Sequence, residues 1–187
     1  MLNHKGTQIL HTPRLLLRPF TPDDAQAMFD NWASDENVTR YLTWQPHTSP
    51  ELTRQLLTEW SKEYAKPDYY NWVMELEGVP IGNISVVYLD DHHEYAVLGY
   101  CMGKAYWNQG LMTEAASTVI DFLFAQIGVH RIEISHAIKN PGSGRVAQKC
   151  GLTREGIKRS FYKTIQGEYL DIAYYSILRN EWEHNQH

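Results

Sequence analysis

The chain has 187 residues, 43% of them hydrophobic, which is enough for one domain with a substantial core and too few for two, so we expect a single domain over residues 1–187. Its formal net charge is -5 and its Lys and Arg residues are spread along the chain, which argues against a surface that binds nucleic acid. No apolar stretch approaches the roughly 18 residues of a membrane span, so the sequence predicts a soluble cytoplasmic protein.

The first third of the chain is predicted to hold one strand and two helices. A strand at 14–20 is followed by Thr21-Pro22-Asp23-Asp24, which supplies a helix N-cap, a proline at the first helical position and acids for the positive helix end. This helix should run to about Ala33 and bury one stripe, consisting of Ala25, Met28, Phe29 and Trp32. Ser49-Pro50-Glu51 predicts a second helix, whose apolar residues are Leu52, Leu56, Trp60 and Tyr64.

From Tyr70 onward the apolar residues follow the two-residue period of strands. Residues 70–76 and 81–89, joined by a turn at Glu77-Gly78, predict a hairpin, and a loop should follow. A strand over 94–102 then leads through a glycine turn into a long helix that begins near Met112 and ends at Gly128. The predicted buried face of that helix consists of Met112, Ala116, Val119, Ile120, Leu123 and Ile127.

A further strand over 130–138 completes a strand–helix–strand unit. Such a unit places its two strands parallel, with a right-handed crossover. After Asn140-Pro141-Gly142, a short helix over 143–149 should end at Gly151. Two last strands, over 157–164 and 169–178, are expected to pair around the Gln166-Gly167 turn.

The junction before the long helix carries the clearest chemical signal. Residues 107–113 place a glycine turn directly before a helix whose first N–H groups have no partners inside the helix. Those amides and the helix dipole together attract an anion such as a pyrophosphate. A single glycine before a helix is also a common tight turn, and the usual glycine-rich nucleotide patterns are absent, so a second signal is needed.

That second signal follows about 25 residues later. Y-W-N-Q-G-L-M-T-E-A, followed by N-P-G-S-G-R-V-A-Q-K-C-G-L, resembles the GNAT superfamily of N-acetyltransferases. T-P-R-L-L-L-R-P-F-T-P-D-D-A, S-D-E-N-V-T-R-Y-L-T-W at 34–44 and T-R-E-G-I-K extend the resemblance to the ribosomal-protein N-terminal (serine/alanine) acetyltransferase branch. The resemblance implies a mixed α/β (α+β) fold, with a twisted mixed sheet of about seven strands, a splayed parallel central pair and about four flanking helices.

The resemblance also implies that acetyl-coenzyme A is the cosubstrate. Backbone amides of 108–113 would hold the pyrophosphate, and pantetheine would lie along residues 100–103 like an added strand. Asn140 would contact pantetheine, although Asn140 and Ser143 are also good turn and helix-cap residues. The coenzyme-binding residues that the resemblance implies are Cys101, Met102, Trp107, Asn108, Gln109, Gly110, Leu111, Met112, Thr113, Asn140 and Ser143.

For acyl transfer, the resemblance implies that the Met102 amide donates to the developing oxyanion, usually the largest electrostatic effect in such a reaction. The Ser143 hydroxyl would protonate the leaving thiolate. Tyr162 is a second candidate acid, because certain members of the branch use an acid at that place; a strand tyrosine is also a common core residue.

The sequence leaves the identity of the general base open. Many relatives have a glutamate two residues before the Gly-Tyr of the coenzyme strand, but Val97 occupies that position here. Glu94 and Asp91 are substitutes, each of which is also explained as a solvated loop charge, and a chain of waters is a third candidate. We take Glu94 as the carboxylate to test.

Metal and covalent chemistry are not indicated. The nine histidines show no metal-ligand spacing, and His130 and His136 would be roughly 20 Å apart along one strand, so we expect no metal. Cys101 and Cys150 form no C-x-x-C pair, and Cys101 has the neighbours of a buried strand thiol. The amine is therefore expected to attack the thioester directly.

Three functions compete. Acetylation of a protein N-terminal α-amine, with a ribosomal protein as partner, is favoured by the branch resemblance and by the missing base, because an α-amine loses its proton more readily than a lysine. A small-amine acetyltransferase acting on a polyamine, amino acid or antibiotic would suit the acidic net charge. A non-catalytic acyl-coenzyme A sensor is suggested only by Val97. The chain is expected to be a monomer or a homodimer.

Overall fold

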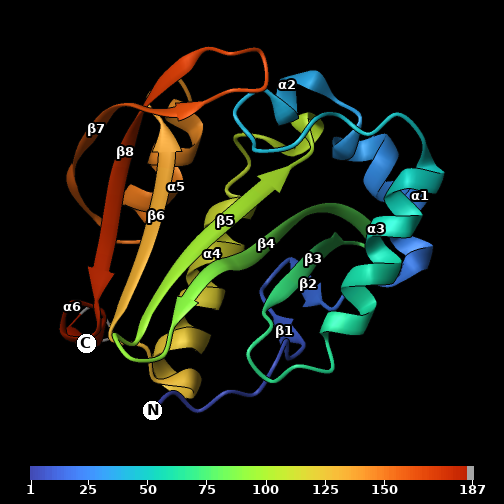
Figure 1. The fold of residues 1–187 in the computed structure, drawn as a ribbon. Coiled ribbons are helices and arrows are strands. Elements are labelled where there is room, and N and C mark those ends of the chain that lie inside the picture. The colour runs from blue at the N-terminus through green and yellow to red at the C-terminus, as the bar shows by residue number, and fades with distance from the viewer. Residues whose placement is uncertain (185–187) are drawn as a thin grey trace.

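The computed structural model describes residues 1–184, which form one twisted sheet with helices on both faces (Figure 1). The described residues contain eight strands in the spatial order β1-β2-β3-β4-β5-β6-β8-β7. Of the neighbouring strand pairs in this sheet, β5 and β6 run parallel and the others run antiparallel. The strands are β1 (Leu10–His11), β2 (Leu15–Arg18), β3 (Asn71–Leu76), β4 (Val79–Asp90), β5 (Tyr95–Met102), β6 (Arg131–Ala137), β7 (Thr153–Lys163) and β8 (Tyr169–Leu178).

Six α-helices accompany these strands within residues 1–184. They are α1 (Ala25–Met28), α2 (Glu36–Thr39), α3 (Pro50–Glu63), α4 (Leu111–Phe122), α5 (Pro141–Lys149) and α6 (Arg179–His184). Two 3-10 turns, at Pro22–Asp24 and Lys104–Tyr106, and two π-helical turns, at Phe29–Ala33 and Leu123–Ile127, extend or precede them. No helix in this part of the chain is both long and apolar enough to cross a bilayer.

The two faces of the sheet carry separate cores because successive strand side chains point to opposite sides. On β3, Trp72 and Met74 face the core that contains α4, whereas Val73 between them faces the core that contains α1 and α3. The predicted buried face of the long helix is confirmed, since all six of its residues are buried.

The predicted mixed fold with a parallel central pair is confirmed. Residues 1–184 contain one strand and two helices more than the sequence predicted. The eighth strand is β1, only two residues long, which pairs with β2 through Leu10↔Leu17. Helices α2 and α6 are the additional helices. The start signal of α2 is in the sequence, because Asp35 caps it by accepting a hydrogen bond from the Asn37 amide at 2.8 Å.

The two early helices differ from expectation in detail. The first is not one continuous α-helix, because Ser34 donates both its amide and its hydroxyl to the Phe29 carbonyl and so closes a wider, π-type turn. In α3 the fully buried residues are Thr53 and Leu57, whereas Leu52, expected inside, is 44% exposed. Leu57 packs into the core that holds Phe20, and the other three expected residues, Leu56, Trp60 and Tyr64, are partly buried against the same core, as predicted.

Candidate active site

Strands β5 and β6 diverge halfway along their length. Their pairing runs from Tyr95↔Arg131 to Leu98↔Ile134 and then stops. Beyond that point β5 stays with β4, and β6 stays with β8. Figure 1 shows the two arrows opening toward the end where α2 lies. We call this the open end of the strand pair.

Backbone amides of β5 face the space between the diverging strands. Gly103 donates to the Ile81 carbonyl at 2.9 Å, which makes Gly82↔Met102 a non-hydrogen-bonded pair of the β4–β5 ladder. The N–H groups of Met102 and, two residues earlier, Tyr100 therefore point toward β6. Among the described strands no partner pairs with them there, because the β5–β6 register ends at Leu98. This orientation supports the expected oxyanion role of the Met102 amide.

The Met102 carbonyl is held by a side chain from the following loop. The indole N–H of Trp107, which is 40% exposed, donates to that carbonyl at 2.7 Å. Trp107 thus fixes the end of β5 relative to the glycine turn. The sequence suggested Trp107 as a coenzyme contact, and the structure adds this positioning bond.

The glycine turn has the expected form. Gly110 is the N-cap of α4, with φ 79° and ψ -3°, a left-handed conformation that favours glycine, and no side chain caps the helix. Asn108 is also left-handed, with φ 61°. The first amides of α4 therefore remain available for an anion, while the Leu111 and Met112 side chains are buried in the core.

Arg14 was missed as a residue of this turn. Its guanidinium donates to the Gln109 carbonyl at 3.1 Å and forms an ion pair with Glu114 at 2.7 Å. It thereby joins the start of β2 to the first turn of α4 and places an arginine–glutamate ion pair beside the glycine turn. The T-P-R sequence gives no sign of this contact, since the partners lie about 100 residues apart.

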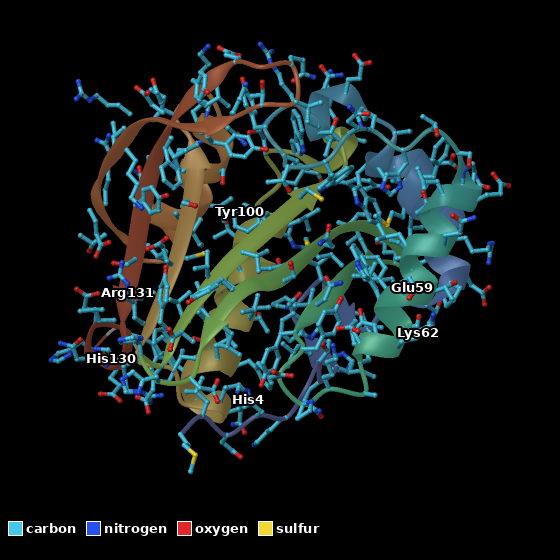
Figure 2. All side chains as sticks on the ribbon, viewed as in Figure 1. His4, Glu59, Lys62, Tyr100, His130 and Arg131 are labelled. Carbon is cyan, nitrogen blue, oxygen red and sulfur yellow. The ribbon has the colours of Figure 1, made fainter. Side chains whose placement is uncertain are left out.

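Ser143 and Tyr100 form a hydrogen-bonded pair between α5 and β5. Asn140 caps α5 by accepting from the Ser143 amide at 3.4 Å. The Ser143 hydroxyl donates to the Tyr100 hydroxyl at 3.0 Å, and Tyr100 donates to the Ser143 carbonyl at 3.1 Å. Burial raises the pKa of Tyr100, so its phenol stays protonated. Figure 2 marks Tyr100 between β5 and β6. The sequence pointed only to the backbone of Tyr100.

Helix α5 lies directly over the His136 side chain of β6. A Cβ on Gly144 would lie only 2.7 Å from Nε2 of His136, so only glycine permits this approach. His136 bonds the Ala137 carbonyl through Nδ1 at 2.8 Å, and its buried Nε2 has no hydrogen-bond partner in the described chain. The close packing fixes the position of Ser143, the residue next to Gly144.

Cys101 points to the opposite face from Tyr100. Its thiol donates to the Asn83 side-chain carbonyl at 2.9 Å, and it packs against the core formed by α1 and α3. Burial raises the pKa of the Cys101 thiol to about 12, so the nucleophilic thiolate is scarce at neutral pH. This environment supports direct transfer without an acyl-cysteine intermediate.

Glu94 lies at the paired end of β5 and β6. Its carbonyl accepts from the amides of His130 and Arg131, and its carboxylate is 3.7 Å from the ammonium of Met1. Eight residues of strand separate it from Met102, a distance of roughly 26 Å. The structure does not bring Glu94 together with the other candidate residues.

Glu94→Gln is therefore expected to leave kcat/KM within about twofold of the wild-type value, because a general base must lie within hydrogen-bond reach of its proton, directly or through one water. Steady-state kinetics with a peptide acceptor measure this. A loss on the order of 100-fold with intact coenzyme binding would restore Glu94 as the base.

Tyr162 joins two segments at the open end of the strand pair. Its hydroxyl donates to the Leu42 carbonyl at 3.1 Å, and its ring packs with Tyr41 and Tyr174 against a small core that includes Ala137, the last residue of β6. The bond ties β7 to the loop after α2. No three His, Cys, Asp or Glu residues within 1–184 are grouped as a metal site.

Comparisons with known proteins agree with this geometry. The model of the acetyltransferase (GNAT) domain matches residues 14–153. The uncharacterized N-acetyltransferase YoaA of Bacillus subtilis is 31% identical over 91% of this chain and 97% of its own length. The ribosomal protein uS5-alanine N-acetyltransferase of Escherichia coli is 25% identical over 92% of each chain.

Two further comparisons show the breadth of these similarities. The spermidine N(1)-acetyltransferase of Vibrio cholerae is 21% identical over 90% of this chain and 95% of its own length. The solved structure of RimL, a ribosomal alpha-N-protein acetyltransferase in complex with coenzyme A, superposes with a TM-score of 0.83 at 20% identity, covering 91% of this chain and 98% of that one. At this identity the structural match supports the fold.

Proposed function

The chain belongs to the GNAT acetyltransferase family, and on that premise we propose that it transfers acetyl from acetyl-coenzyme A to the N-terminal α-amine of a protein of the ribosomal type, in the cytoplasm. Acetyl transfer is the activity of the family. The observation that carries the proposal is the divergence of β5 and β6 beside a glycine-capped helix, which leaves backbone donors free for a thioester and a pyrophosphate.

On the donor side, each part of the coenzyme has a matching feature. The unpaired amide of Tyr100 suits the amide-rich pantetheine, which would add to β5 as a strand does, and the Met102 amide is left for the thioester oxygen. The amides at the start of α4, with Arg14 nearby, suit the pyrophosphate. These available amides fit acetyl-coenzyme A.

The reaction needs no enzyme-bound acyl group. The amine nitrogen attacks the thioester carbon, and the Met102 amide donates to the oxygen as it gains charge. The carbon–sulfur bond then breaks, the thiolate takes a proton from the Ser143 hydroxyl, and the proton released by the amine replaces it through solvent. A thiol of pKa near 8.5 is a fair leaving group, so this acid contributes modestly.

The acceptor class rests on the amine chemistry and on the relatives. Glu94 lies at the paired end, far from the Met102 amide, and an amine that is already partly uncharged at neutral pH depends less on a carboxylate base. Relatives named for ribosomal-protein acetylation cover nearly the whole chain. The acidic net charge and the spermidine acetyltransferase relative favour a small polyamine as the second candidate.

Mass spectrometry of ribosomal proteins from cells with and without this chain tests the proposal. We expect one or a few N-termini, beginning with Ser or Ala, to lose acetylation when the chain is absent. If every ribosomal N-terminus is unchanged while purified enzyme acetylates spermidine, the small-amine function replaces the proposed one.

Ser143→Ala is expected to lower kcat about tenfold and to change the affinity for acetyl-coenzyme A less than threefold, because the hydroxyl acts on the leaving thiolate. Tyr100→Phe, which keeps the ring but removes the hydroxyl that orients Ser143, should give a smaller loss in kcat. Kinetics and calorimetry on both variants separate the two effects. If Tyr162→Phe lowers kcat more than Ser143→Ala does, the acid is Tyr162.

A further inference from the structure

The strand β7 carries an unusual row of cations. Nearly all of its residues are exposed, and it holds four cations, Arg154, Lys158, Arg159 and Lys163, against one carboxylate, Glu155, which is bonded to Arg131. Within residues 1–184 none of these four cations forms an ion pair with a carboxylate. Because the chain as a whole has a net charge of -5, this positive strand is where a negatively charged partner would gain the most electrostatic binding energy.

Exposed aromatic rings accompany these cations. The Lys158 ammonium lies 4.1 Å from the centre of the Tyr174 ring and 4.7 Å from that of Phe161, and the Lys163 ammonium lies 5.5 Å from that of Tyr169. Phe161 is 58% exposed and Tyr169 is 60% exposed. The rings hold the ammonium groups in place without neutralising them. Lys158 pairs with Ile172 and Lys163 pairs with Tyr169, so the two lysines lie on opposite faces of the hairpin. We call Lys158, Arg159 and Phe161 the hairpin surface.

The hairpin surface begins beside the open end of the strand pair. Tyr162, within β7, is bonded to Leu42 and packs over the end of β6. Figure 1 shows the turn of the β7–β8 hairpin beside α2, at the end to which β5 and β6 open. A polypeptide whose first amine enters between β5 and β6 would therefore leave across this hairpin, and the 11 residues of β7 span roughly 35 Å.

The chemistry of the surface selects among occupants. A second copy of this chain is disfavoured, because a two-fold interface would set these cations against themselves, and two bulges in β7 interrupt edge-to-edge pairing. Nucleic acid is disfavoured by the net negative charge of the rest of the chain. An acidic polypeptide satisfies the cations, and apolar side chains among its acids can pack on Phe161.

We propose that the hairpin surface binds an acidic segment of the polypeptide acceptor, located a few residues beyond the acetylated amine. The inference rests on the proposed function, because it requires a protein acceptor, and it adds the class of protein. Acceptor choice then depends on charge downstream of the N-terminus as well as on the first residue.

Three peptides of about 12 residues test it, with identical first three residues and with Asp/Glu, Asn/Gln or Lys in the remainder. We expect kcat/KM for the acidic peptide to exceed that for the neutral peptide about tenfold at low salt, since two exposed ion pairs contribute about threefold each. The ratio should fall toward one as salt screens the charges. Equal rates for acidic and neutral peptides would overturn the inference.

Charge reversal locates the effect. Lys158→Glu combined with Arg159→Glu should bring the acidic-to-neutral ratio to one or below, and this ratio is insensitive to a general folding defect, which lowers both rates alike. The control is Lys62→Glu, a reversal of an exposed lysine on α3, across the molecule (Figure 2), which should keep the ratio. A ratio that survives in the β7 variant, or that Lys62→Glu also abolishes, overturns the inference, as does selective binding of an RNA oligonucleotide to the hairpin surface. If none of the three peptides is acetylated at its shared N-terminus, the proposed function fails, and the inference fails with it.

Discussion

Gly110→Val is expected to weaken acetyl-coenzyme A binding by about 100-fold or more, because a pyrophosphate at the start of α4 would lose charge-assisted bonds from backbone amides, each about 1.5–3 kcal/mol. In the protein itself a Cβ at this position meets only the Arg14 guanidinium, at 3.6 Å, and a branched side chain on a left-handed residue would disturb the turn that presents these amides. Calorimetry with acetyl-coenzyme A measures the loss.

The substitution also strains the backbone, and the chain offers a matched control for that. Gly128 is likewise left-handed, with φ 93°, and a Cβ there would also meet only a guanidinium, that of Arg179 at 3.9 Å. Gly128→Val should cost a similar 1–3 kcal/mol of stability in thermal melts while leaving coenzyme affinity within about threefold. If the two variants bind the coenzyme equally well, Gly110 serves folding alone.

An N-terminal α-amine should be acetylated about 400-fold faster than a lysine on the same peptide at neutral pH. The factor follows from their ordinary pKa values, about 7.8 and 10.4, when only the uncharged amine reacts and no base assists it. The expected kcat/KM rises about tenfold per pH unit below pH 7 and levels near pH 8, since the fraction of uncharged α-amine grows with pH until its pKa is passed.

Mass spectrometry of the acetylated peptide, with kinetics from pH 6 to 9, checks both statements. The matched control is the same peptide with its α-amine blocked, which leaves only lysine to react. Acetylation mainly on lysine, or a profile that levels well below the pKa of the free amine, would show that the enzyme supplies a strong base and would contradict the α-amine account.

The parts of the fold that were predictable are those that depend on neighbouring residues. Three patterns each predict a local conformation: Gly110 before a helical apolar pattern, Asn140 three residues before Ser143, and the strand–helix–strand order. Local signals also mark the start of α3 at Ser49-Pro50. These signals are enough for the core of the sheet and for the pyrophosphate turn.

The remainder depends on register and on contacts between distant segments. Which amides of β5 face β6 is set by the Gly82↔Met102 pairing, and a shift of one residue would turn the Met102 amide toward β4. The contacts of Arg14 with Gln109 and of Tyr162 with Leu42 join residues about 95 and 120 positions apart. No periodicity in one sequence predicts such pairs. The remoteness of Glu94 is likewise a result of where the strands pair.

The tight fit of Gly144 over His136 has a consequence for acid stability. Burial, together with the nearby Arg154, lowers the pKa of His136, so the folded chain binds this proton less readily than the unfolded chain does. His136 therefore contributes its full stabilisation above a pH of about 6.5, the pKa of histidine in the unfolded chain, and this contribution declines as the pH falls below that value. A proton on Nε2 would have no acceptor beneath α5. In mildly acidic surroundings α5 should loosen before the rest of the sheet, and with it the serine that the leaving thiolate needs.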